Sequence, residues 1–557
     1  MLKALLVFTV LTGAVSAQTA PPPNQSPNPT PTNFMVILCD DLGYSDIGCY
    51  GSEIDTPNLD ALAAKGRRYS QFYNTARCWP TRAALLTGYY AQQVRRDTVP
   101  GIPSNAGIQS GAQGKRQAWA KLLSERLQAH GYHSYHSGKW HVDGQATKQG
   151  FDHSYTLNDH DRHFRPKNHT LDDRPLPPLA ETEAYYTSSA IASYAIDQLR
   201  NHAALHKDKP FFSFVAFTAP HFPLQAPENL VNKYRQRYRE GWEQTRDKRW
   251  KNIERLGLAT HVPKPSDVEQ EQGPPYHLPD ALKKLGDAEV NRPIPWSQLN
   301  DEQREFQTSK MAVHAAMIDA MDSEIGRIIG YLKEDQQRWN NTLILFLSDN
   351  GASAEIMVRG DGHDHSRPAG ADGTFLCLGP GWSTVSNTPF RKHKTWVHEG
   401  GISTPFIAHW PAGITPLDTP VENPHHVIDI SPTLLEIASR ASGPNKASES
   451  NSTDSVPPMP GRSFLSEFGT HNSPVQITKP EEEVRPLWWQ HEGNRALRLG
   501  NLKIVAAGKE ANWELYDLDR DRAETNNLAL ERPDELKRLV DLWQRMSEEF
   551  TKNAYKE

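Results

Sequence analysis

Cysteine is scarce in this chain, with four residues among 557. So few thiols exclude a small scaffold that depends on disulfide bonds. A strong net charge is also missing, because 61 basic residues nearly balance 67 acidic ones and leave a net charge of -6. The overall positive charge that is typical of nucleic-acid-binding proteins is therefore absent, and we expect no nucleic-acid partner.

Hydrophobic runs long enough to cross a membrane are missing too, since no segment approaches the ~20 apolar residues that a spanning helix needs. The nearest candidate is the apolar segment 4–15, which follows Lys3. Together with the small residues Val15-Ser16-Ala17, it predicts a signal peptide over 1–17. We therefore expect export, to the periplasm or outside the cell after cleavage, and no stable membrane insertion. An uncleaved membrane anchor is the alternative.

What the chain does have is aromatic residues, with 14 Trp, 18 Tyr and 18 Phe to build hydrophobic cores. Its length exceeds the ~250–300 residues at which one core stops growing, so we expect more than one domain. Pro-rich and Ser/Pro-rich stretches mark the boundaries. They predict a spacer at 18–32, a large α/β domain at 33–439, a linker or insertion at 440–458 and a C-terminal α+β subdomain at 459–557.

Short runs that are apolar on both faces alternate with helical patterns along the large domain. Such runs are typical of buried parallel strands. The alternation predicts a large mixed, mostly parallel sheet flanked by helices. The expected strands are 34–39, 133–136, 211–217 and 342–347, and the expected helices are 58–65, 119–130, 188–202 and 311–333.

Two further regions have patterns of their own. Residues 228–258 are charged, aromatic and helical in pattern, which predicts a solvated helix pair; the alternative is a role at the rim of a substrate site. Near the end of the chain, short strand-like runs are separated by turn residues and followed by a helical pattern at 533–550. The runs at 486–490, 496–499, 502–506 and 513–518 predict a small antiparallel sheet.

Acidic side chains follow two of the expected strands. Asp40-Asp41 comes after the first, and Asp349-Asn350-Gly351 comes after another, hundreds of residues later. Ligands of open α/β sheets bind at the carboxyl ends of the strands. Three carboxylates and an amide form an oxygen-only set, which suits Ca²⁺ or Mg²⁺ better than Zn²⁺. Either pair alone is also explained by a turn at the end of a strand.

A third motif surrounds Cys78. Pro80 suits the first turn of a helix, so Cys78 is expected at a helix N-terminus, where the helix dipole favours an anion. A buried unreactive thiol and a thiolate nucleophile are both open from this pattern.

When the Cys78 motif is taken together with the other motifs of the chain, the chain resembles the type I sulfatases, the formylglycine-dependent branch of the alkaline phosphatase superfamily. Cys78-x-Pro80-x-Arg82, continued by Leu86-Thr87-Gly88, matches the sulfatase signature. The last matching stretches look most like the bacterial arylsulfatase subgroup. The other matches are Asp40–Tyr44, Thr56–Asp60, Gly138-Lys139-Trp140-His141, Ala219-Pro220-His221, Ser348–Gly351, Lys394, His398–Gly401 and Trp513–Asp517. Three residues depart from the usual pattern: Trp79, Thr81 and Ser403.

The resemblance implies a sulfuric ester hydrolase. Cys78 would be converted to formylglycine by a sulfatase-maturing enzyme, and its hydrate would attack the sulfur of an aryl or carbohydrate sulfate ester. The covalent sulfo-enzyme would then eliminate inorganic sulfate. One Ca²⁺ per chain is implied, with Mg²⁺ possible in its place, held by Asp40, Asp41, residue 78, Asp349 and Asn350.

The family pattern also implies roles for six residues around the reacting group, Cys78 among them as the nucleophile. Arg82 and Lys139 would hold the hydrate, and His141 would assist the second step. His221 and Lys394 would bind sulfate oxygens and protonate the leaving alcohol.

Two other functions are weighed against this one. A phosphonate or phosphate monoester hydrolase would use the same kind of site, and an inactive protein would only bind sulfated glycans. Several residues have open roles. We expect Asp361–His365 to be a polar loop rather than a second metal site. The pocket or turn candidates are Tyr44, His398 and His491–Arg495. We expect buried thiols at Cys39, Cys49 and Cys377, with a Cys39–Cys49 disulfide as the alternative for the first two.

Overall fold

The computed structural model describes residues 31–98, 115–180, 184–259, 262–263, 278, 280–442, 456–469 and 484–556. The expected signal peptide, nearly all of the spacer and most of the linker lie outside these residues. Within the part that is described, no helix combines the length and the apolar character needed to traverse a bilayer. The division of the chain at 440–458 stays a prediction.

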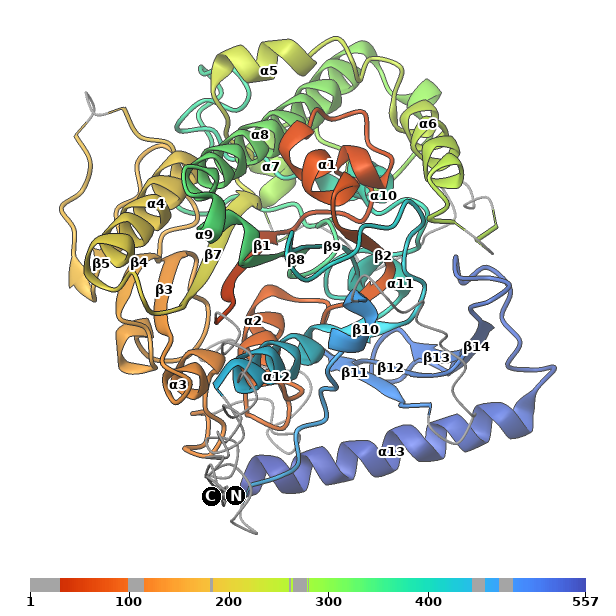
Figure 1. Cartoon of the computed structure of the whole chain (residues 1–557). Coiled ribbons are helices and arrows are strands. Elements are labelled where there is room, and N and C mark those ends of the chain that lie inside the picture. The colour runs from red at the N-terminus through yellow and green to blue at the C-terminus, as the bar shows by residue number, and fades with distance from the viewer. Residues whose placement is uncertain are drawn as a thin grey trace, which may run out of the picture.

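A ten-stranded sheet forms the centre of the molecule (Figure 1). Its order is β10-β2-β9-β8-β1-β7-β3-β4-β5-β6, and its middle strands pair in parallel. Antiparallel pairs join β9 to β2 and β8, and β5 to β4 and β6. The predicted mixed, mostly parallel sheet is therefore confirmed. The strands are β1 Asn33–Asp40, β2 Arg67–Tyr73, β3 His133–Gly138, β4 His153–Leu157, β5 His169–Leu171, β6 Arg174–Pro175, β7 Phe211–Pro220, β8 Thr342–Ser348, β9 Ser403–His409 and β10 His425–His426.

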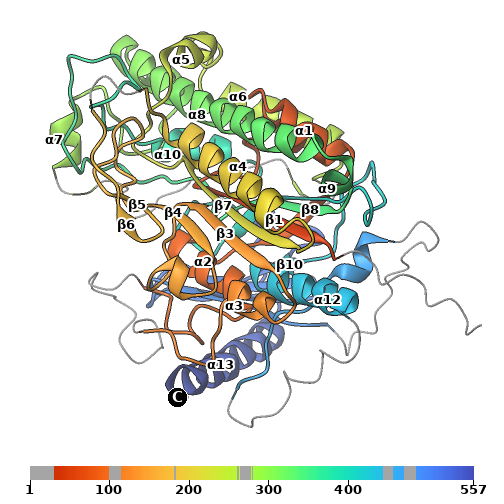
Figure 2. The same cartoon turned by 60° about the vertical axis from the view of Figure 1, so that its left-hand side comes forward.

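Helices cover both faces of this sheet, which explains why β1, β7 and β8 are apolar over most of their length. All residues of β7 and β8 are buried, as are all of β1 except its first. Figure 2 shows α1, α4 and α8 over one face and α2, α3 and α12 over the other. These helices are α1 Pro57–Ala64, α2 Cys78–Thr87, α3 Leu123–Gln128, α4 Thr187–Leu205, α8 Asp301–Lys333 and α12 Ile430–Ser442.

Two of the expected helices have other boundaries. The helix expected at 119–130 is confined to α3, because the Glu125 carboxylate accepts from the Leu122 backbone N–H (2.7 Å) and starts the helix there. Helix α8 begins ten residues earlier than expected, at Asp301 rather than Met311. Asn300 and Gln303 cap it reciprocally, through bonds of 2.8 and 3.1 Å. The Asn-x-x-Gln spacing that forms this cap is visible in the sequence.

The helix pair expected within 228–258 is present as α5 Glu228–Tyr234 and α6 Trp242–Arg255. Helix α6 is fastened to the domain by buried Arg249, which pairs with Asp46 at 2.7 Å and with Glu53 at 2.9 Å. A role of this pair at a substrate rim stays a prediction. The remaining helices are α7 Ala281–Leu285, α9 Gln336–Asn340, α10 Gly379–Ser386 and α11 Glu399–Ile402.

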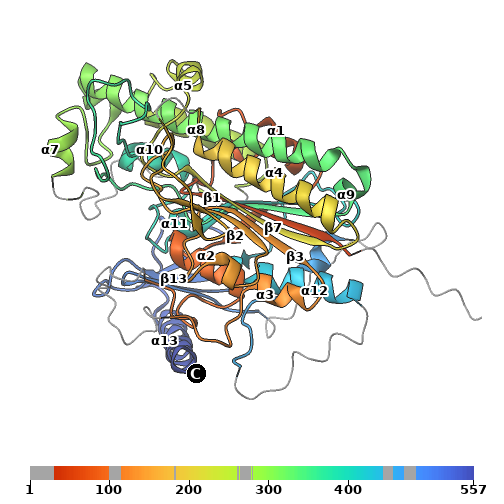
Figure 3. The same cartoon turned by 90° about the vertical axis from the view of Figure 1, so that its left-hand side faces the viewer.

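The C-terminal sheet and helix are confirmed. A four-stranded antiparallel sheet in the order β11-β12-β13-β14 packs beside α13, Pro533–Tyr555 (Figure 3). It joins the large domain through a buried ionic cluster, in which Lys503 contacts Glu399 (2.9 Å) and Glu524 (2.8 Å). The strands are β11 Leu487–His491, β12 Asn494–Leu499, β13 Leu502–Ala506 and β14 Glu514–Asp517.

The four cysteines are all free thiols. The Cys39–Cys49 disulfide considered from the sequence is therefore not formed. Cys39 lies inside β1, where its thiol is directed to the carbonyl of Leu347 on β8 at 3.2 Å. Cys39 and Cys377 are buried as expected, whereas Cys49 is only half-buried.

Candidate active site

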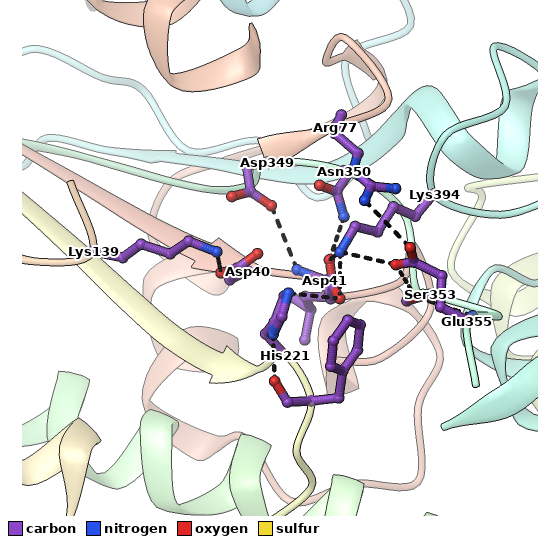
Figure 4. Close-up of polar contacts among 12 residues, drawn as sticks. Asp40, Asp41, Arg77, Lys139, His221, Asp349, Asn350, Ser353, Glu355 and Lys394 are labelled. Carbon is purple, nitrogen blue, oxygen red and sulfur yellow. Dashed lines mark hydrogen bonds and ion pairs between the residues drawn. The ribbon is translucent and has the colours of Figure 1, made fainter. Parts of the chain in front are cut away.

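Four neighbouring strands bring the predicted residues to one edge of the large sheet. β8, β1, β7 and β3 are adjacent and parallel, so their carboxyl ends lie side by side. In the register, Cys39 stands opposite Ser348, and Asp40 stands opposite Pro220. At or directly after these ends come Asp40, Asp41, Lys139, His221, Asp349 and Asn350, which gather in Figure 4.

Helix α2 adds the signature residues from the other side. Cys78 is its first residue, as predicted, and Gly88 ends it in the left-handed conformation with φ 78°. All ten residues of the helix are buried. One turn after Cys78, the guanidinium of Arg82 donates to Oδ2 of Asp349 at 2.8 and 3.0 Å and to the Lys139 carbonyl at 2.7 Å. Arg82 thus ties the helix to two of the strand ends.

Ion pairs connect the remaining charged residues. Lys139 donates to Asp40, while Lys394 lies 2.8 Å from Oδ1 of Asp41 (Figure 4). The Asn350 amide donates to the same oxygen of Asp41 at 2.7 Å. Three carboxylates therefore face three cations in a region with almost no solvent exposure. The cluster consists of Asp40, Asp41 and Asp349 with Arg82, Lys139 and Lys394.

A backbone contact fixes the loop that carries Asp349 and Asn350. Gly351 lies so close to the Gly400 carbonyl that a Cβ at this position would stand 1.9 Å from its oxygen. Any larger residue would push the loop off β8 and move both polar side chains. This explains why the motif Asp349-Asn350-Gly351 ends in glycine.

The oxygen atoms fit a cation. Asp40, Cys78 and Asp349 offer ligand atoms within 4.8 Å of one another, and Asp40, Asp41 and His221 form a second such group. Oδ1 of Asp40 and Oδ1 of Asn350 are buried and have no hydrogen-bond partner among the described residues. Buried polar atoms are nearly always paired, so these two oxygens indicate a missing partner. Oxygens of this kind suit Ca²⁺ or Mg²⁺.

The charges within the cluster act on one another's ionisation. Burial, with Asp40 beside it, raises the pKa of Asp349 to about 7. Burial also opposes the ionisation of Asp40, but Lys139 and Arg82 outweigh it and keep the pKa of that carboxyl below its usual value. Burial raises the pKa of the Cys78 thiol. At neutral pH the unmodified residue is therefore a thiol rather than a thiolate, which argues against the thiolate interpretation.

Two histidines predicted from the motifs also reach the site. His221 donates from Nδ1 to the carbonyl of Phe222, and its Nε2 lies 3.8 Å from Oδ2 of Asp41. His141 follows Lys139 and packs edge-on against the Trp79 ring, with centroids 5.3 Å apart. Burial holds the pKa of both imidazoles well below the usual value, and nearby lysines add to the effect, so both rings are neutral at pH 7.

Three residues of the site were missed from the sequence. Glu355 lies 3.4 Å from Lys394 and 3.2 Å from Arg77 (Figure 4). His160 places its ring 5.3 Å from that of His141 and 5.7 Å from that of His221. Arg77 stands directly before Cys78, and Glu355 comes four residues after Gly351, but a single charge in a loop carries no spacing signal. His160 belongs to a loop in which Asp and His alternate with other polar residues, which gives no signal either.

The three pocket or turn candidates from the sequence make contacts that stabilise the fold. Tyr44 is buried in the core and donates to the Ser70 carbonyl at 3.1 Å. His398 lies 3.5 Å from Glu514 of the C-terminal sheet. His491–Arg495 is the hairpin between β11 and β12, and Asp97 raises the pKa of His491 to about 9 despite its burial.

The loop Asp361–His365 is polar, as expected. Asp361 pairs with Arg162 at 2.7 Å and with Lys167 at 2.9 Å, and His365 lies 2.8 Å from the Lys284 carbonyl. Among the described residues, this loop does not supply a group of three ligands that could hold a metal.

Comparisons with known proteins show which sequences and structures the chain is similar to. The sulfatase family model matches residues 32–440. An uncharacterized sulfatase of Schizosaccharomyces pombe is 34% identical over 551 residues, covering 92% of each chain. An arylsulfatase of Klebsiella aerogenes is 32% identical over 439 residues, which is 74% of this chain and 88% of the relative.

Solved structures share the fold. The crystal structure of Ps i-CgsB in complex with k-i-k-neocarrahexaose superposes with a TM-score of 0.61 at 21% identity and covers 93% of both chains. A protein solved in complex with its substrate D-glucosamine-2-N,6-O-disulfate gives a TM-score of 0.61 at 18% identity, covering 95% of this chain and 100% of the other.

Proposed function

The chain belongs to the sulfatase family and is a sulfate ester hydrolase, and we propose that its nucleophile is a formylglycine made from Cys78. The observation that carries the proposal is the position of Cys78. It begins a buried helix, and its sulfur lies within 4.8 Å of carboxylate oxygens of Asp40 and Asp349. An aldehyde hydrate at this position would offer its hydroxyls to the same cluster.

The burial of Cys78 constrains how it is modified. Its exposed fraction is 5%, and the rest of α2 is buried as well. A sulfatase-maturing enzyme has no access to the thiol once this helix has packed. We therefore expect the conversion to take place on the unpacked chain, and the maturing enzyme to be a transient partner.

In the first chemical step, one hydroxyl of the hydrate at position 78 passes its proton to the Asp349 carboxylate and attacks the sulfur of the ester. An S–O bond to residue 78 forms, and the S–O bond to the leaving group breaks. Lys139 and Lys394 lie beside the carboxylates and supply positive charge for the sulfuryl oxygens. His221 and Lys394 are the groups placed to give the leaving oxygen its proton.

In the second step, the remaining hydroxyl at position 78 loses its proton to a base, for which neutral His141 is suited. The electron pair forms the aldehyde C=O bond, and the C–O bond to sulfate breaks. Inorganic sulfate leaves and water hydrates the aldehyde again. Two hydroxyls on one carbon are required for this elimination, which a serine cannot perform.

A divalent cation, Ca²⁺ or Mg²⁺, would be held by Asp40, Asp41, Asp349 and Asn350 together with residue 78. When bound, it supplies Lewis-acid stabilisation of charge on the sulfuryl oxygens. The residues fit this role because two buried oxygens of the set have no partner among the described residues. Arg82 keeps Asp349 oriented through its two hydrogen bonds, and Lys139 does the same for Asp40.

Replacing Asp349 by Asn should remove the cation. The substitution takes away one of three carboxylates and leaves the Arg82 guanidinium with the more distant Asp40, at 3.9 Å, as its anionic partner. We expect elemental analysis to fall from about one Ca²⁺ per chain to much less, and added Ca²⁺ should no longer raise the melting temperature, because only a bound ligand stabilises the native state.

The matched control is Asp322→Asn, which alters an equally buried carboxylate on α8 that accepts from the backbone N–H groups of Asn58 and Leu59. This variant should keep its metal even if its stability falls. One Zn²⁺ per wild-type chain, with zinc alone restoring activity after chelation, would overturn the calcium assignment.

Sulfate release tests the reaction itself. Wild-type protein from a host that makes formylglycine should hydrolyse nitrophenyl sulfate faster than nitrophenyl phosphate, and mass spectrometry should find an aldehyde at position 78. A reversed preference would identify a phosphate monoester or phosphonate hydrolase. An unmodified Cys78 without turnover would leave only binding of sulfated glycans.

We also propose that the protein acts outside the cytoplasm. The proposal is supported by Lys3, the apolar run at 4–15 and the small residues that follow. Sulfated carbohydrates or aryl sulfates would then meet the enzyme in the periplasm or the medium. Sequencing the N-terminus of the mature protein, which we expect at Gln18, tests this.

A further inference from the structure

A continuous series of aromatic rings crosses the site. Trp79 contacts His141, His141 contacts His160, and His160 contacts His221, with centroids 5.3, 5.3 and 5.7 Å apart. The interplanar angles of these pairs are 80°, 72° and 86°, so each ring meets the next edge-to-face. His160 is the one member that lies between two residues placed in the chemistry and has no role in it so far.

The loop that carries His160 is held in place by ion pairs with a second loop. Arg162 pairs with Asp159 and with Asp361, both at 2.7 Å. Asp161 pairs with Arg359 at 2.8 Å. These contacts flank His160 on both sides in the sequence. Its ring therefore keeps its position beside His141 and His221 without help from a ligand.

The His160 ring has a nitrogen that no described residue of the protein binds. Nδ1 is buried and lacks a hydrogen-bond partner among the described residues. A proton on Nδ1 would be buried without an acceptor, so the neutral ring carries its proton on Nε2. Since the residue is only half-buried, Nε2 is the nitrogen that can meet a ligand.

The partial exposure also shows which side of the substrate His160 faces. The carboxylates, Arg82 and Lys139 are buried and surround the place of the sulfuryl group. His141 and His160 are half-buried, as are Arg77 and Glu355 beside Lys394, and these residues mark where the site opens. The part of the ester that extends toward the opening is the leaving group.

We propose that His160 is a specificity-determining residue that donates a hydrogen bond from Nε2 to the leaving group of the sulfate ester. A plain aryl group has no acceptor to offer there, whereas a sugar has hydroxyl and ring oxygens. The preferred substrate class is therefore a carbohydrate sulfate. This inference rests on the proposed sulfatase function and adds the leaving-group side to it.

The test compares two substrate kinds in the mature, formylglycine-containing enzyme. The substrates are a panel of galactose and glucosamine monosulfates and nitrophenyl sulfate. His160→Phe keeps a ring for the edge-to-face contacts with His141 and His221 but removes the donor. We expect the ratio of kcat/KM for the best sugar sulfate to that for nitrophenyl sulfate to fall about tenfold, the scale of one lost hydrogen bond.

A second variant separates hydrogen bonding from packing. His160→Gln loses the ring but can place an amide N–H near the position of Nε2, so it should restore most of the ratio. A packing role alone predicts the reverse, with Phe harmless and Gln damaging, and would overturn the proposal. His206→Phe is the matched control, because His206 stacks on His133 (3.9 Å) at the opposite ends of the strands.

Turnover by the wild-type enzyme tests the role of His160 separately from the sulfatase reaction. Turnover of nitrophenyl sulfate without turnover of any sugar sulfate in the panel would overturn the role of His160 and leave the sulfatase reaction standing. Turnover of neither kind would overturn the proposed function, and the role of His160 with it.

Discussion

Replacement of Cys78 by serine should convert the enzyme into a reagent that reacts once. A serine at the start of α2 has one hydroxyl beside the same carboxylates and lysines, so it can accept a sulfuryl group from the substrate. It has no second hydroxyl on that carbon, and sulfate cannot be eliminated. We expect at most one equivalent of nitrophenol per chain and then no further turnover.

Rapid-quench kinetics and intact-protein mass spectrometry check this result. The variant should gain the mass of one SO₃ group, located at position 78. Cys78→Ala should show neither the mass gain nor any turnover, while its circular dichroism and melting temperature stay close to those of the wild type. Cys49→Ser, in a half-buried position away from the strand ends, is the control.

Multiple turnover by Cys78→Ser, or near-wild-type activity of Cys78→Ala, would contradict a nucleophile at this position. The first result would mean that water cleaves the sulfated serine directly. The second would move the attack to another residue or to water. In both variants the remaining cysteines are buried or half-buried, so no fully exposed thiol competes for the substrate.

The carboxyl ends of the strands were the most predictable part of the molecule. A run such as 342–347 is apolar on both faces, which indicates a buried parallel strand, and Asp349 directly after it must then lie at the carboxyl edge of the sheet. The same reasoning placed Asp40. Proximity of the two acids followed from topology, since β1 and β8 are neighbours.

Edge strands and loops were harder to predict. β2 has Tyr and Phe among Arg and Gln, so its sequence shows no regular alternation of apolar and polar residues. It pairs with β9, which lies more than 300 residues later in the chain. Glu355 and His160 reach the site through loops whose paths are fixed by tertiary ion pairs. Nothing local in the sequence specifies such a path, so only the structure reveals these neighbours.

His221 has the geometry of a proton donor to the leaving group. Its Nδ1 is engaged by the Phe222 carbonyl, which holds the ring and favours a proton on that nitrogen. Nε2 then faces the cluster, 3.8 Å from Asp41 (Figure 4). Burial and the nearby lysines lower the pKa of His221, so its acidic form requires the negative charge of a bound sulfate ester to offset them.

His221→Ala should therefore have an effect that depends on the leaving group. A nitrophenol departs as a stable anion and needs little protonation, whereas a sugar alcohol needs a nearly complete proton transfer. We expect the sugar sulfate to lose on the order of 10²–10⁴-fold in rate, the usual contribution of a general acid. The loss for nitrophenyl sulfate should be much smaller.

A plot of log rate against leaving-group pKa measures this directly. The line for His221→Ala should be steeper than that for the wild type, because negative charge now accumulates on the leaving oxygen. The control is His206→Ala. His206 lies between α4 and the amino end of β7, so this variant should reproduce the wild-type line. Parallel lines with a uniform drop would show that His221 only binds sulfate. The acid would then be Lys394, whose ammonium is kept protonated by Asp41 and Glu355 despite its burial, and substitution of that lysine would produce the steeper line instead.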